Sequence, residues 1–266
     1  MKRIFIAFFA VILFASGVQN AQSSTIKKEL FLTTTDCTKI AINHYKTGHN
    51  EVVIMAPGWF MSKDSKPFKH MAEDFSQNYD VIALDFRGHC KSSGTFTFTA
   101  REPEDLRTVV CYAKNQYKKV YLIGFSLGGA TAVIHTANCK NIDKLILVSA
   151  PVSFDKIENE MWKKEAFIPT LQKCELSRWV SVRPGKFWLK KISPIDVIQT
   201  ISPTPILIIA GEKDPTVHPW HAKALYDKAK EPKKLIIIKD GIHAEDLYLK
   251  DPKNFVNTCT QWIKTN

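Results

Sequence analysis

The sequence lacks several patterns that would direct an interpretation of function. It has no C-x-x-C pair and no cluster of cysteine and histidine spaced for zinc, so we expect no metal site. It has no nucleic-acid-binding motif, no internal repeat and no low-complexity tract. Outside the N-terminus, no apolar run reaches the roughly 20 residues of a membrane-spanning helix. We therefore expect a globular chain with no zinc site and no nucleic-acid partner.

The N-terminus carries the one long apolar run. Lys2 and Arg3 precede an unbroken apolar stretch over residues 4–15, and small residues follow up to Gly17. This order is typical of a secretory signal peptide, and it predicts cleavage after residue 17, with residue 21 as the alternative. The run is short for a membrane span, although a retained N-terminal anchor is the other interpretation. We expect a secreted or periplasmic protein with no transmembrane segment in the mature form.

Cysteine content and charge leave several alternatives open. The six cysteines are even in number, and export would permit disulfides, but six cysteines allow 15 pairings and the sequence does not choose among them. Buried free thiols are the alternative. The cysteines are Cys37, Cys90, Cys111, Cys139, Cys174 and Cys259.

The formal net charge of +11 comes from scattered and paired lysines, which we interpret mainly as solvated surface. A basic exterior also favours peripheral contact with an anionic membrane or with cell-envelope polymers.

Alternating apolar strands and helices predict the fold class. Two β-like runs at residues 29–33 and 39–45 flank a turn and favour a hairpin. Short apolar runs then alternate with helical stretches to the end of the chain, which indicates a mostly parallel twisted sheet with helices on both faces. The 266 residues, 45% of them hydrophobic, suit a single α/β domain over residues 25–266. The expected buried strands are 51–56, 81–85, 120–125, 144–149, 205–210 and 234–239.

The interval 152–202 interrupts this alternation. It contains no clear buried strand, and several aromatic residues lie in it among lysines. We interpret it as a short helical cap insertion over the carboxyl ends of the strands, where open α/β sheets bind their ligands. Its aromatic side chains would then wall a pocket, pack the insertion onto the core, or do both.

The segment Gly124-Phe-Ser126-Leu-Gly128 matches the pattern of a nucleophile elbow. It lies between an apolar strand and a helix of small residues. A serine on so sharp a turn is held in strained backbone, and the residues two before and two after it approach each other closely enough to require glycine. Ser126 is therefore the candidate nucleophile.

Two further loops supply a candidate acid and base. Asp214 and His243 each follow a separate predicted strand, and with Ser126 they occur in the chain order Ser, Asp, His. A serine needs an imidazole to accept its proton during attack, and a carboxylate on the other ring nitrogen fixes the tautomer. Glu212 is the rival for the carboxylate. We interpret His218 and His221 as part of a helix start, because a metal pair would lack a third ligand.

The same chemistry requires main-chain donors for the developing oxyanion. Leu127 supplies one N–H at the start of the helix that follows Ser126. The second is expected from the loop after residues 51–56, with Trp59 as the first candidate and Phe60 as the alternative. The Trp59 side chain would in addition form an aromatic lid on the pocket.

Together these motifs resemble the α/β-hydrolase superfamily, in particular its small serine esterases, lipases and serine aminopeptidase-like members. The resemblance covers about residues 29–266. It rests on the three loops above, on Pro57-Gly-Trp59 where the family often has His-Gly-x, and on residues 85–94, which are similar to its D-x-R-G-H-G-x-S-x-G loop. Two departures stand out, since Pro57 replaces the usual histidine and Cys90 replaces a usual glycine.

The resemblance implies an exported serine hydrolase that cleaves a carboxylic ester through an acyl-enzyme, without metal or cofactor. The aromatic insertion and the absence of an evident charged selector favour an ester with an apolar, lipid-like acyl group. A thioesterase or a peptidase/amidase with the same three residues is the nearest alternative. A catalytically idle binding protein of the same fold is the alternative from another class, because fold does not fix function.

Overall fold

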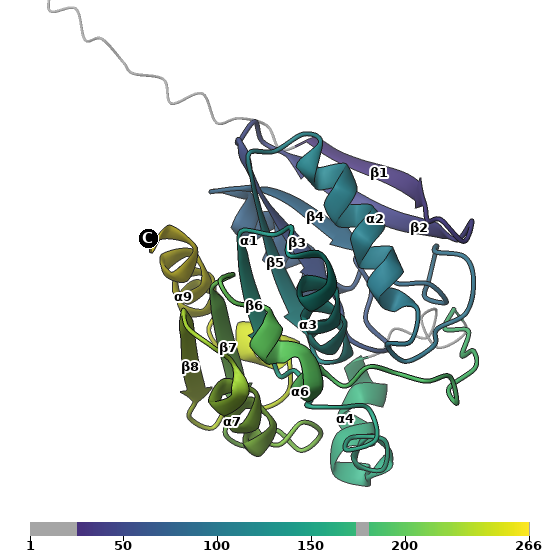
Figure 1. Cartoon of the computed structure of the whole chain (residues 1–266), viewed down its shortest axis with the longest axis vertical. Helices are drawn as coiled ribbons and strands as arrows, with labels where there is room; N and C mark the ends of the chain where they lie inside the picture. The colour runs from purple at the N-terminus through teal and green to yellow at the C-terminus, as the bar shows by residue number, and fades with distance from the viewer. Residues whose placement is uncertain (1–25, 174–180, 266) are drawn as a thin grey trace, which may run out of the picture.

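The computed structural model describes residues 26–173 and 181–265, with residues 170–173 described by their backbone only. The predicted signal peptide and Cys174 lie outside the described residues. Figure 1 shows a central sheet covered by helices on both of its faces. The expected α/β class, with an N-terminal hairpin and a mostly parallel sheet, is confirmed.

Eight strands form the sheet in the order β1-β2-β4-β3-β5-β6-β7-β8. β1 pairs with β2, and β2 with β4, in antiparallel fashion, whereas every later pair is parallel. The central strands are buried on both faces, as their continuous apolar sequences predict. The strands are β1 (Ile26–Thr33), β2 (Lys39–Lys46), β3 (Glu51–Ala56), β4 (Asp80–Leu84), β5 (Lys119–Phe125), β6 (Lys144–Val148), β7 (Ile206–Gly211) and β8 (Lys233–Ile238).

The sheet separates two hydrophobic cores. Apolar residues of α2 (Glu102–Lys114), α3 (Leu127–Cys139) and α7 (Pro219–Lys228) pack on one face. Apolar residues of α1 (Lys66–Ser76), α8 (Glu245–Lys250) and α9 (Pro252–Lys264) pack on the other. Side chains spaced by three and four residues form the buried stripe of α1, for example Phe68, Met71 and Phe75. Both faces of the sheet are thus covered by packed helices.

The interval 152–202 contains short helical elements and no strand in its described part. They are η1 (Glu160–Trp162), α4 (Lys164–Lys173), α6 (Pro194–Val197) and η2 (Ile198–Thr200). In Figure 1, α4 projects beyond the sheet on the side where β7 and β8 end. Farther along, Arg183 N–H donates to Gly88 O at 2.7 Å, and Phe96 N–H donates to Arg183 O at 2.9 Å. The segment around Arg183, inside this interval, is thus joined to the loop between β4 and α2.

Two further observations bear on the sequence expectations. Among the described residues, none of the helices has the length and apolar character required to cross a membrane. The five described cysteines are free thiols, and Cys259 is buried, so the disulfides that the even number permitted do not form among these five.

Candidate active site

Ser126 occupies a strained turn between β5 and α3. Its φ of 51° and ψ of −122° lie outside the regions that ordinary residues favour. A Cβ atom on Gly124 would lie 2.7 Å from Gly128 O, and one on Gly128 would lie 2.2 Å from Pro57 O. Both positions therefore require glycine: Gly124 because of its approach to Gly128, as the motif predicted, and Gly128 because of the backbone at Ala56 and Pro57. The close approach also presses α3 against the end of β3.

The structure brings the three candidate side chains into one hydrogen-bonded chain. His243 Nε2 lies 3.0 Å from Ser126 Oγ, and His243 Nδ1 lies 2.7 Å from Asp214 Oδ2. The three residues follow β5, β7 and β8, and parallel pairing of β5 through β8 places the ends of these strands along one edge of the sheet. The geometry permits transfer of the serine proton to the imidazole.

Asp214 is held in place by backbone N–H groups. Its side chain is buried, and its Oδ1 accepts the N–H groups of Thr216 at 2.9 Å and Val217 at 2.8 Å. Burial acts to raise the pKa of Asp214, but the charge of His243 and these hydrogen bonds outweigh it, so the pKa lies below its ordinary value. The rival Glu212 instead accepts the N–H of Asp240 at 3.0 Å.

The loop that carries His243 has an anchor that the sequence did not reveal. Ala244 N–H donates to Ser149 Oγ at 3.0 Å, and Lys213 N–H donates to Gly241 O at 2.8 Å. Ser149 follows β6 directly and is fully buried. A serine at a strand end carries no distinctive motif, so no sequence signal pointed to this contact.

The candidate oxyanion donors border Ser126. Leu127 is the first residue of α3, so its N–H has no acceptor within the helix. On the other side, a Cβ atom on Gly58 would lie 3.0 Å from Ser126 Cβ, which places the loop containing Trp59 against the nucleophile. The oxyanion role of the Trp59 N–H, with Phe60 as the alternative, stays a prediction.

Lys63 and Asp85 anchor the loop that contains Trp59. Lys63 N–H donates to Asp85 Oδ1 at 2.8 Å, and both side chains are buried. Lys63 Nζ also donates to Glu29 Oε1 at 2.7 Å. These contacts anchor the loop that follows Pro57, the position where proteins that this sequence resembles often have histidine.

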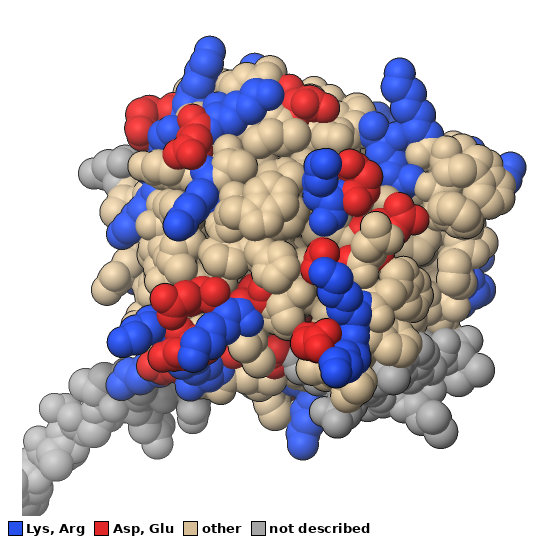
Figure 2. Space-filling view, turned by 90° about the horizontal axis from the view of Figure 1, so that it is seen from below, with Lys and Arg blue, Asp and Glu red and all other residues tan. Residues whose placement is uncertain are grey.

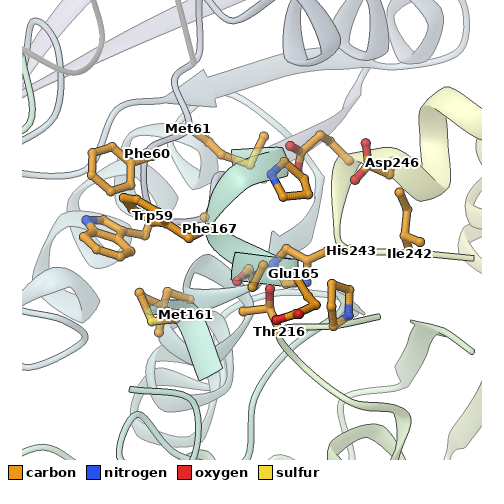
Figure 3. Close-up of a pocket in the computed structure, with 17 residues that line it drawn as sticks. Trp59, Phe60, Met61, Met161, Glu165, Phe167, Thr216, Ile242, His243 and Asp246 are labelled. Carbon is orange, nitrogen blue, oxygen red and sulfur yellow. Dashed lines mark hydrogen bonds between the residues drawn. The ribbon is translucent and has the colours of Figure 1, made fainter. Parts of the chain in front are cut away.

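A cavity of about 190 Å³ opens above Ser126 and His243. Figure 3 shows aromatic and sulfur-containing side chains around it, including Trp59, Phe60 and Phe167. Three carboxylates also line it, which differs from the expectation that no charged selector is present. They come from the α4 and α8 segments, which are distant in sequence, and are Glu165, Glu245 and Asp246.

The other candidate residues lie outside this chain of hydrogen bonds. Val152 N–H donates to His221 Nδ1 at 3.3 Å, and His218 Nε2 lies 3.4 Å from Glu160 Oε2. Within residues 26–173 and 181–265, no group of three or more potential ligand side chains could hold a metal. Cys90 Sγ lies 3.4 Å from Ser181 Oγ, where the β4–α2 loop contacts the segment around Arg183.

Comparisons of sequence place this chain among known proteins. A family model for the alpha/beta hydrolase fold matches residues 51–164. The uncharacterized protein YfhR of Escherichia coli O157:H7 is 31% identical over 196 residues, which are 68% of this chain and 61% of that protein. The match thus spans about three fifths of the length of that relative. The human serine hydrolase BPHL is 25% identical over 260 residues, which are 84% of this chain and 86% of BPHL.

Comparisons of structure agree on the fold. An esterase from Pyrococcus furiosus is similar with a TM-score of 0.73 and 22% identity, and the match covers 90% of this chain and 91% of the esterase. The esterase EaEST from Exiguobacterium antarcticum is similar with a TM-score of 0.72 and 21% identity, over 90% of this chain and 100% of that one. The family-model match to residues 51–164, the strand order and the turn at Ser126 together show that the chain has the α/β-hydrolase fold.

Proposed function

We propose that this protein is a serine hydrolase that cleaves a carboxylic ester through an acyl-enzyme intermediate. The observation that carries the proposal is the chain of hydrogen bonds from Asp214 through His243 to Ser126, which ends in an apolar cavity. The names of similar proteins support it, since two of the similar structures are esterases and one relative is a serine hydrolase. The deep burial of Asp214 is consistent with an orienting role.

In the acylation step, Ser126 Oγ attacks the carbonyl carbon while His243 Nε2 accepts its proton. The carbonyl oxygen becomes an oxyanion, which accepts hydrogen bonds from the N–H groups of Leu127 and, as we propose, Trp59. Asp214 stabilises the imidazolium through His243 Nδ1. The imidazolium then protonates the leaving alcohol, which departs as the acyl group remains bonded to Ser126.

Deacylation repeats these steps with water as the nucleophile. His243 Nε2 accepts a proton from water as the water oxygen attacks the acyl carbon, and the same donors hold the second oxyanion. Collapse of this intermediate returns the proton to Ser126 Oγ and releases the carboxylic acid. The cycle needs no group beyond those that this chain supplies.

The cavity favours particular substrates. Its aromatic and sulfur-containing lining suits an apolar acyl group, as the sequence also indicates. The carboxylates of Glu165, Glu245 and Asp246 would repel an anionic substrate, so we propose neutral esters over esters that carry a free carboxylate. Thioesters and amides present the same carbonyl to the same groups and are the nearest alternatives.

Hydrolysis of p-nitrophenyl esters of graded acyl length tests the proposal. We expect turnover by the wild-type protein with a maximum at one chain length, and loss of turnover in Ser126→Ala because the attacking oxygen is removed. Equal rates in the two proteins would contradict the proposal. Binding of the esters without turnover by the wild-type protein would instead support an idle binding protein.

We further propose that the protein is exported after cleavage of its N-terminal segment, from the charged and apolar pattern of residues 1–17. Cell fractionation followed by N-terminal sequencing checks this. A mature chain that begins after residue 17 or 21, outside the cytoplasm, is the expected result, and an intact Met1 in the cytoplasmic fraction would contradict it.

A further inference from the structure

Ser149 lies where the loops carrying the three candidate residues meet. It follows β6, which lies between β5 and β7 in the sheet. Ser126 N–H donates to Val148 O at 2.9 Å, and Ser149 N–H donates to Ile209 O at 2.8 Å. Ala244 N–H donates to Ser149 Oγ at 3.0 Å. Val148 and Ser149 thus connect three segments, which are the end of β5 at Ser126, the strand β7 that leads to Asp214, and the loop that carries His243.

The backbone at this point is strained on both sides of the side-chain contact. Ser149 has φ of 50°, and Ala244 has φ of 50° with ψ of −110°. Residues with a Cβ atom rarely adopt such angles, and they persist only where surrounding contacts impose them. Both residues are fully buried, so the N–H of Ala244 has no access to water in place of the serine hydroxyl.

We infer that Ser149 is a positioning residue for the His243 imidazole. The hydroxyl accepts the N–H of the residue that directly follows His243, and so fixes where the imidazole stands between Ser126 and Asp214. A shift of about 1 Å in such a group can lower a rate by about a hundredfold. The predicted effect on kcat rests on the proposed ester hydrolysis. The claim that Ser149 fixes the position of the His243 imidazole does not depend on that function.

Two variants separate positioning from stability. Ser149→Ala removes the acceptor and keeps the strained backbone, whereas Ser149→Gly removes the acceptor and relieves the strain. The matched control is Ser76→Ala, which removes a buried hydroxyl that donates to Glu73 O at 2.7 Å near the end of α1. If Ser149 were only structural, activity would follow stability, and Ser149→Gly would stay close to the wild type.

The experiment measures kcat and KM for a p-nitrophenyl ester, together with the NMR signals and pKa of the His243 imidazole. We expect kcat to fall about ten- to hundredfold in both Ser149 variants, with KM little changed, and the His243 signals to shift or broaden in both. Urea denaturation measures the stability of each variant, and Ser76→Ala should leave kcat, KM and the His243 signals unchanged.

The outcomes distinguish the positioning role of Ser149 from the proposed esterase function. His243 signals and kcat that match the wild type in Ser149→Gly would overturn the role of Ser149. A wild-type protein without esterase turnover would overturn the proposed function, while altered His243 signals in the Ser149 variants would still support the positioning role. A loss that appears equally in Ser76→Ala would show a general effect of removing a buried hydroxyl and would also overturn the inference.

Discussion

The hydrogen bonds of Asp214 fix the orientation of its carboxylate toward His243. One of its oxygens accepts two backbone N–H groups, and the other lies 2.7 Å from His243 Nδ1. The carboxylate is therefore fixed in rotation before it meets the imidazole. Its lowered pKa keeps it ionised through the neutral range, so it remains an acceptor for the imidazole N–H.

Substitution of Asp214 by asparagine tests this at the scale of one residue. Asp214→Asn keeps the shape of the side chain but removes the charge and allows the wrong imidazole tautomer. We expect kcat for ester hydrolysis to fall by roughly 10⁴, the loss that the same change causes in a serine protease. Glu212→Gln is the control and should retain activity. The reverse result, with Glu212→Gln inactive and Asp214→Asn active, would assign the acid role to Glu212.

The candidate residues differ in how far the sequence predicts them. Ser126 lies in a motif with a mechanical reason for each glycine, and Asp214 and His243 follow apolar strands in a recognisable order. Ser149 has none of these marks, because its contact with Ala244 depends on how the loop after β8 packs against the end of β6. The distances among these side chains are set by that packing and not by local sequence.

At the scale of the element, the turn from β5 into α3 depends on close backbone contact. Gly128 lies so near the end of β3 that a Cβ atom would be 2.2 Å from Pro57 O and 2.4 Å from Ala56 O. Neither carbonyl can move freely, because β3 is the central strand between β4 and β5. An alanine at position 128 would therefore force α3 to tilt away from the sheet.

Gly128→Ala is expected to disturb this element strongly. Because overpacking against backbone atoms forces a shift of the main chain, we expect a loss of stability of about 1–3 kcal/mol and a marked fall in ester turnover. Urea denaturation and ester hydrolysis provide the two measurements. Gly48→Ala is the control for backbone strain alone, since Gly48 has φ of 93° but no atom within 4 Å of an added Cβ. A Gly128→Ala protein as stable and active as the wild type would contradict the account.

The regular elements were predictable because their apolar residues form recognisable runs or stripes. The central strands are short continuous apolar runs, and α1 and α9 each have an apolar stripe; the structure confirms these elements together with the hairpin, α2, α3 and α7. The interval 152–202 was predicted to be helical, but it has no dominant period, so the bounds of its short helices and the contact of Arg183 with Gly88 could not be derived. For the same reason, the position of Glu165 at the cavity was not foreseen.

At the scale of the whole molecule, buried histidines link stability to pH. His44, His89, His135 and His221 are buried, and burial lowers the pKa of each to about 4. Their unfolded pKa is near 6.5, so between pH 6.5 and pH 4 the unfolded chain binds more protons than the folded one. Each histidine therefore makes the folded state less stable as the pH falls through this range. Buried Asp85, with its pKa raised to about 6, acts in the opposite direction.

A single variant isolates one histidine from these opposing groups. In His135→Gln, the glutamine can still reach Asn141, which His135 Nε2 contacts at 3.1 Å. We expect the slope of the unfolding free energy against pH, between pH 6.5 and pH 4, to be smaller than in the wild type by up to about 1.4 kcal/mol per pH unit. Urea denaturation across this range measures both slopes. Identical slopes would contradict a neutral, buried His135.

The outer surface of the interval 152–202 exposes large apolar side chains beside lysines. Trp162, Phe187 and Trp188 are 57%, 53% and 69% exposed, and lysines adjoin them in the sequence. Figure 2 shows the molecule from the side of α4, with basic side chains around broad uncharged areas and acidic side chains beside several of them. Aromatic and basic side chains together favour the surface of an anionic bilayer.

Binding to lipid vesicles tests this proposed contact. We expect the protein to sediment with vesicles that contain anionic lipid, less with neutral vesicles, and less again at high salt. The double variant Lys186→Glu and Lys190→Glu should weaken binding, whereas Lys234→Glu, at the start of β8, should not. Equal sedimentation with neutral and anionic vesicles, or none with either, would contradict the contact.

Labelling with a fluorophosphonate followed by mass spectrometry tests the central claim most directly. The reagent bonds to a serine only when a neighbouring base activates it, so it reports the Ser126–His243 contact without a choice of substrate. We expect one adduct per chain on the peptide that contains Ser126, no adduct in Ser126→Ala, and slow labelling in His243→Ala. A folded wild-type protein that takes no label at Ser126 would contradict the account.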